Sequence, residues 1–145
     1  MLQFLSQGGN AADLAKRTVE VFISGGAFSA GDWVMLNTSS SDSDRVATCI
    51  KASTSFSTGN PLVVGVALEA ATAAGQKIKV VTRGYVEGAN VATAVNAAGL
   101  ALVVDGTAAG RAVAIEATDL CSACGVSLEA ASSNTCDVFV YGLAR

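Results

Sequence analysis

The hydrophobic positions of this chain recur every two residues, which is the period of a β-strand. Along Thr18-Val19-Glu20-Val21-Phe22-Ile23 the odd positions place Val, Val and Ile on one face, and Glu20 points away from it. In Lys77-Ile78-Lys79-Val80 the lysines alternate with apolar residues in the same manner. Both patterns predict half-buried strands. Further strands are expected at 33–36, 46–51, 62–68, 100–104, 111–115, 125–128 and 137–141.

Turn residues separate these segments, as at Ser24-Gly25-Gly26 and Asp105-Gly106. Many short strands at such spacing favour an all-β sandwich or barrel. One short helical pattern precedes them, from Asn10 to Lys16, with Asn10 as a candidate N-cap.

The chain also repeats itself. Gly65-Val66-Ala67-Leu68-Glu69-Ala70-Ala71 returns as Gly125-Val126-Ser127-Leu128-Glu129-Ala130-Ala131, and each copy leads into an apolar strand that ends in glycine, at Gly84 and at Gly142. Two copies are fewer than a solenoid needs. They predict a single compact β domain over 18–145, built from pseudo-repeats at about 31–88 and 99–145, with an N-terminal arm over 1–17.

The composition restricts the partners. Charged residues make up 14% of the chain and hydrophobic residues 51%, against about 25% charged residues in ordinary globular proteins. The surface is therefore either rich in Ala, Ser and Thr or largely covered by partners. The net charge is −3 and the basic residues are spread along the chain, which argues against nucleic acid as a partner.

No segment has the pattern of an export signal or a membrane span. The opening residues lack the basic start of a signal peptide, and the weakly polar run from Val91 to Val104 is shorter than the ~20 residues of a membrane helix. We therefore expect a protein that is made in a cytoplasm and has no membrane partner.

Three apolar residues lie near the start of the arm, at Leu2, Phe4 and Leu5, ahead of Gly8-Gly9 and outside both repeats. Termini are ordered only when something ties them down. The arm either packs on its own domain or docks on a neighbouring subunit, and in the second case Leu2, Phe4, Leu5 and Leu14 are the candidate contacts. Trp33, in an apolar strand, is a candidate core anchor, with an exposed contact residue as the alternative.

Catalytic patterns are missing. The chain has no histidine, which removes the commonest general base, the Ser–His and Cys–His pairs and histidine metal sites. Glu69 and Glu129 occupy equivalent positions in the two repeats, so a role in the fold explains them better than a catalytic pair does. The Asp42-Ser43-Asp44 segment departs from a calcium loop, and Gly106 to Arg111 departs from a phosphate loop. We expect neither an enzyme nor a bound metal or cofactor.

Cysteine gives one suggestive spacing, the CxxC of Cys121 and Cys124. A redox site would need a βαβ setting and a zinc site would need a second CxxC, and neither accompanies it. In a hairpin over 125–141, Cys124 and Cys136 would lie beyond the ~7 Å limit for a disulfide. Reduced, buried thiols are the expected state of these residues and of Cys49.

The order of turns and strands resembles the small capsid decoration proteins, or head cement proteins, of tailed bacteriophages. The resemblance rests on the segments Gly31-Asp32-Trp33-Val34-Met35-Leu36, Val64-Gly65-Val66-Ala67-Leu68, Ala73-Ala74-Gly75 and Gly84-Tyr85-Val86, and it covers roughly residues 18 to 142. It implies a β-rich, non-enzymatic virion protein on the outside of an expanded head, commonly a homotrimer, that clamps neighbouring major capsid subunits. The family has no catalytic residues to carry over, and a dimer stays open.

Two other classes of protein are also small and β-rich. A lipoyl-type carrier presents its modified lysine at a hairpin tip, whereas Lys77 and Lys79 fall inside an expected strand. A glycan-binding appendage needs a platform of clustered aromatic residues, and Trp33, Tyr85 and Tyr141 are scattered along the chain. Both remain alternatives to capsid decoration.

Overall fold

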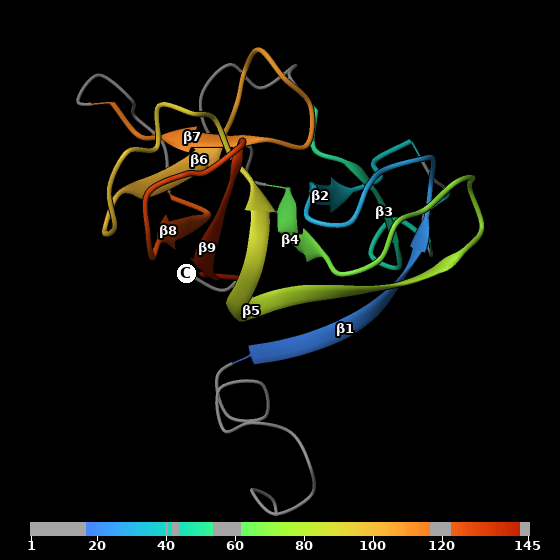
Figure 1. Ribbon diagram of the computed structural model, residues 1–145. Coiled ribbons are helices and arrows are strands. Elements are labelled where there is room, and N and C mark those ends of the chain that lie inside the picture. Colours follow the sequence, from blue (N-terminus) through green and yellow to red (C-terminus); the bar gives the residue numbers. More distant parts are fainter. Residues whose placement is uncertain (1–16, 40, 42–43, 54–61, 117–122, 143–145) are drawn as a thin grey trace, which may run out of the picture.

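The protein is described here by a computed structural model, which covers residues 17–39, 41, 44–53, 62–116 and 123–142 (Figure 1). Every helix or strand among these residues is a β-strand, which confirms the expected all-β fold. The strands are β1 (Arg17–Ser24), β2 (Trp33–Leu36), β3 (Thr48–Lys51), β4 (Val63–Ala67), β5 (Lys77–Asn90), β6 (Ala101–Val104), β7 (Ala112–Ala114), β8 (Gly125–Ser127) and β9 (Thr135–Val140). The short helical pattern at 10–16 lies outside the described residues.

The first five strands close into a barrel. β1 pairs with β5 in antiparallel fashion and with β3 in parallel fashion, and β2 and β4 complete the circuit. Closure removes the free edges that would otherwise pair with other chains. The interior is filled by apolar side chains, namely Phe22, Phe28, Val34, Cys49, Val64, Ala67, Ala71, Ile78 and Val80.

β5 is longer than the sequence predicts. The expected strand ends at Gly84, but the observed strand continues to Asn90. Gly84 lies opposite Arg17 of β1 and also opposite Val140 of β9. Its φ of 104° belongs to the region that glycine adopts readily. A glycine is therefore needed where the strand passes from the first barrel into the second half of the molecule.

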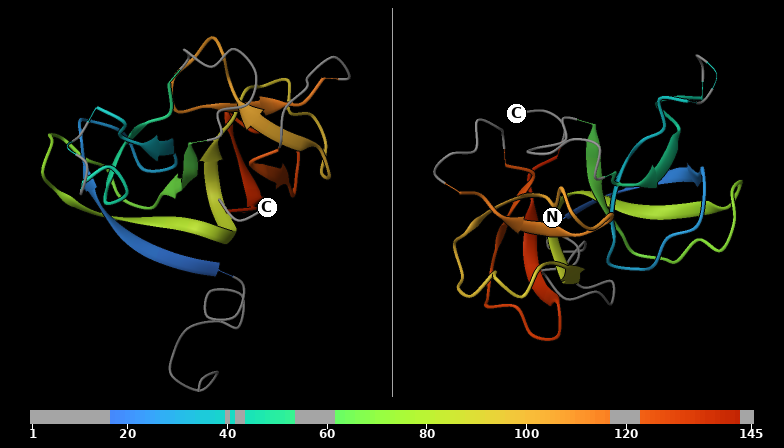
Figure 2. Two further views of the ribbon diagram at one scale, coloured as in Figure 1. Left: turned by 180° about the vertical axis from the view of Figure 1, so that it is seen from behind. Right: turned by 90° about the horizontal axis from the view of Figure 1, so that it is seen from above.

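The second half repeats the strand order of the first. The continuation of β5 is followed across the sheet by β9, β8, β6 and β7. A parallel bridge between Val91 and Ala112 stands where β1 and β3 pair in the first barrel. We call this half the second barrel, and Figure 2 shows the two groups of strands side by side.

Corresponding residues of the two halves make the same backbone hydrogen bonds. The N–H of Gly31 donates to Ala67 O at 2.8 Å, and the N–H of Gly99 donates to Ser127 O at 2.7 Å. Each of these hydrogen bonds joins the residues before one strand to the end of another. The two bonds therefore stabilise equivalent corners, one in each barrel.

The equivalence extends upstream of the segments that the sequence shows as repeats. Phe22 of β1 lies opposite Ile78, and Ala89 of β5 lies opposite Cys136. β1 and the second half of β5 therefore hold the same place in their barrels. The expected repeats at about 31–88 and 99–145 leave β1 out of the first repeat, and they assign most of the second half of β5 to the first repeat instead of the second.

Trp33 joins the two barrels. Its side chain is 0% exposed and belongs to the larger apolar cluster, which combines the interior of the second barrel with the outer face of β2, β4 and β5. The indole Nε1 donates to Asn90 O at 3.1 Å. Trp33 is thus buried between the barrels and not inside either of them.

A buried carboxylate lies beside this contact. Asp32 accepts hydrogen bonds from the backbone N–H of Ser29 and from Nδ2 of Asn90, both at 2.9 Å. Lys51 Nζ lies 3.0 Å from Asp32 Oδ2. Because Asn90 belongs to the second half of β5, Asp32 ties the first barrel to the second. A buried charge paired in this way has a structural role that the sequence did not indicate.

Candidate interaction surface

The carboxylates that the sequence raised as candidates have structural partners. Glu69 Oε2 accepts the backbone N–H of Lys79 at 3.2 Å, and Glu129 Oε1 accepts the N–H of Asp137 at 3.1 Å. Each carboxylate secures the strand that follows its turn. Within the described parts of the chain, no group of three or more His, Cys, Asp and Glu side chains could hold a metal ion.

Asp105 closes the loop from Gly106 to Arg111. Its Oδ1 accepts from the backbone N–H and the hydroxyl of Thr107, both at 2.7 Å, and its Oδ2 accepts from Arg111 Nε at 2.6 Å and also pairs with Arg111 Nη2. Burial acts to raise the pKa of the Asp105 carboxyl, but the Thr107 hydrogen bonds and the Arg111 hydrogen bond and charge outweigh it and hold the pKa below its usual value. The loop is a turn built around this carboxylate.

Cys49, Cys124 and Cys136 are buried, and the Sγ of Cys124 donates to Leu102 O at 3.3 Å. Burial raises the pKa of Cys49 to about 11. Burial, together with the charges of Glu129 and Asp137, raises the pKa of Cys136 to about 11. Thiols held in the neutral form are poor nucleophiles and metal ligands. Cys121 lies outside the described residues.

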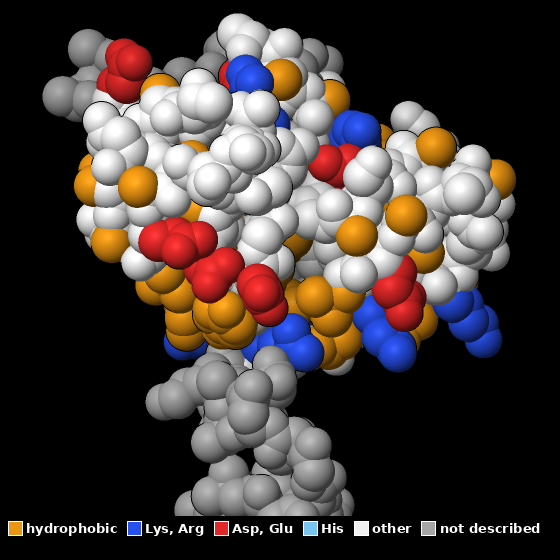
Figure 3. Space-filling model, viewed as in Figure 1, with side chains coloured by type: hydrophobic (Ala, Val, Ile, Leu, Met, Phe, Trp, Pro, Cys, Tyr) orange, Lys and Arg blue, Asp and Glu red, His pale blue; other side chains and the backbone are white. Residues whose placement is uncertain are grey.

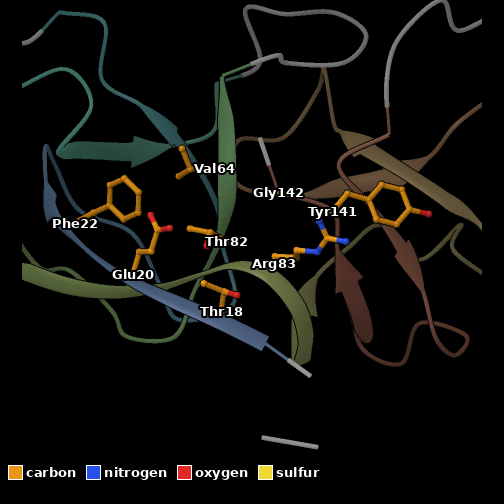
Figure 4. A pocket seen from close by; sticks show the side chains of 8 residues that line it. All are labelled: Thr18, Glu20, Phe22, Val64, Thr82, Arg83, Tyr141 and Gly142. Atoms are coloured by element: carbon orange, nitrogen blue, oxygen red, sulfur yellow. The ribbon is translucent and has the colours of Figure 1, made fainter. Parts of the chain in front are cut away.

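An open cavity lies at one mouth of the first barrel (Figure 4). Its volume is about 290 Å³. In Figure 4, Glu20 and Phe22 project from β1, whereas the Arg83 side chain extends toward Tyr141. The lining residues are Thr18, Glu20, Phe22, Val64, Thr82, Arg83, Tyr141 and Gly142.

The matching mouth of the second barrel is closed. Val86 of the second barrel corresponds to Glu20 of the first. Glu20 lies opposite Val80 and Val86 lies opposite Val138, and Val80 and Val138 are equivalent residues of the two barrels. Val86 is 1% exposed and packs in the cluster that includes Trp33. The first barrel fills the second mouth, whereas no described residue of the chain fills the first. Among the described residues, the first mouth is thus open.

The outer face of β1 carries exposed valines. Val19 is 40% exposed and Val21 is 61% exposed. The buried members of this strand are Phe22 and Ser24, both at even positions, so the prediction that the odd positions of β1 face the core is wrong. Val21 lies opposite Lys79 and Ile23 lies opposite Lys77, which places both exposed lysines on the same face. We call Val19, Val21, Lys77 and Lys79 the β1 face.

Figure 3 shows apolar side chains gathered along the lower edge of the molecule, with Lys and Arg among them and Asp and Glu directly above. The lysine alternation in Lys77-Ile78-Lys79-Val80 is as the sequence predicts, since Ile78 and Val80 are buried. Lys79 has one distant ion pair, to Glu69 at 3.8 Å. The β1 face therefore offers a binding partner both apolar area and positive charge.

The candidate residues of the arm, Leu2, Phe4, Leu5 and Leu14, lie outside the described residues. The described chain begins at Arg17, next to the cavity residue Thr18. The sequence singled out the arm but missed the β1 face. The sequence signal that could have revealed the β1 face is Glu20. It lies on the same side of β1 as Phe22 and lines a cavity that is open to solvent, so the valines lie on the opposite side.

No protein-family model matches the chain. No curated protein is similar enough to serve as a relative. None of the described residues forms a helix that is both long and apolar enough to span a membrane.

Proposed function

We propose that the protein decorates the outer surface of a bacteriophage head and stabilises contacts between major capsid subunits. The observation that carries the proposal is the β1 face, which presents exposed valines beside two lysines and adjoins an open cavity. The order of turns and strands, which resembles that of head cement proteins, supports it. The protein would be made in the host cytoplasm, act without catalysis, metal or cofactor, and reside in the virion as an oligomer.

The chemistry of the β1 face suits a protein partner with an apolar patch edged by acidic residues. Burying an exposed valine is worth roughly 1.5–3 kcal/mol. Exposed ion pairs add typically 0.2–1 kcal/mol, but they favour one orientation. A single copy would therefore bind weakly. Many copies on one symmetric shell add their contributions, which is how a late-joining protein can stabilise the whole particle.

The direct test is binding to expanded heads assembled without this protein. Purified protein should co-sediment with these heads and raise their resistance to heat. Val21→Asp should weaken binding by about tenfold or more, because the loss exceeds 1.4 kcal/mol. Lys79→Glu should weaken binding mainly at low salt.

Val46→Asp is the matched control, since Val46 is 71% exposed and lies outside the β1 face. It should bind as the wild type does. Failure of the wild-type protein to bind heads under any condition would exclude decoration. A lysine adduct in the intact mass would instead favour a carrier, and a specific hit on a glycan array would favour a glycan-binding module.

A further inference from the structure

The first barrel is closed along only part of β1. β5 pairs with β1 from Arg17 to Ile23, whereas β3 pairs only with Ile23 and Ser24 at the end of the strand. The earlier part of β1 therefore has a neighbouring strand on one side and, among the described residues, none on the other.

A backbone hydrogen bond shows which residues of β1 face the unpaired side. Ile23 N–H donates to Ala47 O at 2.8 Å, on the β3 side of the strand. Backbone groups point alternately to the two sides along a paired strand, and the pairing with β5 is regular from Val19 to Ile23. The N–H and C=O groups of Val19 and Val21 therefore point to the same side as those of Ile23, away from β5.

The opposing strand gives the same result for Val21, which lies opposite Lys79. Lys79 O accepts Leu68 N–H at 2.9 Å, and Lys79 N–H donates to Glu69 Oε2 at 3.2 Å. Both backbone groups of Lys79 thus point toward β4, so they are not bonded to Val21. No described residue pairs with Val19 or Val21 on the unpaired side. We call these two residues the open edge of β1, since unpaired backbone groups of a strand can pair with another chain.

The corresponding edge of the second barrel is covered. Asn90, which corresponds to Ile23 by strand register, donates its N–H to Gly31 O at 2.8 Å. A Cβ at Gly31 would lie 2.8 Å from Gly88 O, so backbone of the first barrel passes directly against this edge. In the first barrel Ala47 takes this role at Ile23 only. Upstream of Ile23 the described chain supplies no cover.

The side chains beside the open edge differ on its two sides. Glu20 and Phe22 line the mouth of the first barrel, and both project from β1 in Figure 4. Glu20 has no ion pair with a described residue, and Arg83 extends toward Tyr141. On the outer side lie the exposed valines of the β1 face. A strand added beside β1 would meet an unpaired carboxylate on its inner side and apolar area on its outer side.

We infer that the open edge of β1 binds an extended segment of a partner protein, in which a basic residue alternates with apolar ones. Val19 and Val21 would each exchange two backbone hydrogen bonds with the added strand. The basic side chain would enter the mouth beside Glu20, and its apolar neighbours would lie on the β1 face. In strand addition of this kind the backbone bonds give affinity and the alternate side chains give specificity. Under the proposed function the segment belongs to the capsid partner, and this assignment rests on that function.

The first test uses the purified full chain alone. Amide hydrogen exchange followed by NMR should be rapid at Val19 and Val21. It should be slow at Glu20 and Phe22, whose N–H groups face β5. Slow exchange at both valines would overturn the inference, because another part of the chain would then occupy the edge.

The second test adds a synthetic peptide of about nine residues, the length of a long strand, in which valine alternates with lysine. The peptide should slow exchange at Val19 and Val21 and shift their amide signals. A matched peptide with glutamate in place of lysine should bind about tenfold more weakly or worse, because it sets like charges beside Glu20. Glu20→Gln should reduce this difference. Equal binding of the two peptides to the wild type, or binding that leaves both valine amides unchanged, would contradict the inference.

The third test removes a donor from the open edge. Val21→Pro lacks the N–H on that side but keeps the bonds to β5, since proline is tolerated where an edge N–H faces solvent. It should lose binding of the valine–lysine peptide. Val21→Thr is the matched control, because it keeps the N–H and the branched shape, and it should retain binding. A folded Val21→Pro protein that binds the peptide as the wild type does would overturn the inference. If Val21→Pro unfolds the domain, Val19→Pro and the two peptides decide.

These results are separable from the test of decoration. A wild type that binds heads but not the valine–lysine peptide would overturn the inference and leave the proposed function intact. A wild type that binds the peptide at the open edge but never binds heads would exclude decoration and leave the strand addition intact.

Discussion

The indole of Trp33 meets the second barrel at a position with no side chain, Gly125. A Cβ at Gly125 would lie 3.0 Å from Cη2 of Trp33 and 2.7 Å from the carbonyl oxygen of Phe139. The glycine makes room for the tryptophan, and this pair of residues determines how closely the barrels pack.

Gly125→Ala should therefore destabilise the protein by about 1–3 kcal/mol, the usual cost of overpacking. Gly26→Ala is the matched control, because nothing lies within 4 Å of a Cβ at Gly26. Urea denaturation followed by circular dichroism measures both. Equal stability of the two variants would show that the barrels can move apart at no cost.

Trp33→Ala should cost roughly 3–5 kcal/mol, since it leaves a cavity between the barrels. Trp33→Phe keeps most of the apolar volume but loses the hydrogen bond to Asn90 O, so it should cost less. Denaturation must be followed by circular dichroism, because Trp33 is the only tryptophan. A Trp33→Ala protein of wild-type stability that no longer binds heads would make Trp33 a contact residue.

Asp105→Asn should lower stability at neutral pH by about 1–3 kcal/mol, through loss of its charge-assisted hydrogen bonds. The pKa of Asp105 is lowered in the folded protein, so the stabilisation is present above the unfolded value of about 3.9 and is lost as the pH falls through the lower folded pKa. The wild type and the variant should converge in acid. A constant difference at every pH would contradict this origin.

The buried thiols should be unreactive. In a Cys121→Ser background, a disulfide reagent at mildly alkaline pH should label none of Cys49, Cys124 and Cys136 in the folded protein and all of them in denaturant. The pKa of about 11 at Cys49 and at Cys136 exceeds the unfolded value of about 8.5. Stability is therefore fully present below the unfolded pKa and falls as the pH rises toward the folded one. Rapid labelling of the folded protein would contradict the burial.

Deleting residues 1–9 removes Leu2, Phe4 and Leu5 but no described strand. The truncated protein should keep its melting temperature, while decorated heads lose resistance to heat or osmotic shock if the arm is part of the clamp. Each large apolar side chain contributes roughly 1.5–3 kcal/mol when buried, less about 1–2 kcal/mol of backbone entropy per residue. Full protection by the truncated protein would place the clamp on the barrels.

Local alternation was enough to locate most strands. β2 coincides with the expected 33–36, and the alternation of Lys77 with Ile78 places the core side of β5 correctly. The end of β5 was missed because Gly84 looks like a terminator in sequence. Only the pairing of Gly84 with strands on both sides shows that the chain continues through it.

The surfaces were harder to predict, because burial there depends on residues far along the chain. Val19 and Val81 are neighbours in one row, yet one is 40% exposed and the other is 0% exposed. Nothing near either valine in sequence distinguishes them. The difference arises from the second barrel, which covers Val81 and stops short of Val19.

The continuous strand β5 also has a consequence for folding. Because the same strand closes the first barrel and opens the second, unravelling of one barrel frees one end of a strand that the other barrel uses. The halves should melt in a single calorimetric transition. A cut at Gly84 should leave two fragments that fold only when mixed, so the molecule cannot be reduced to one repeat even though it contains two.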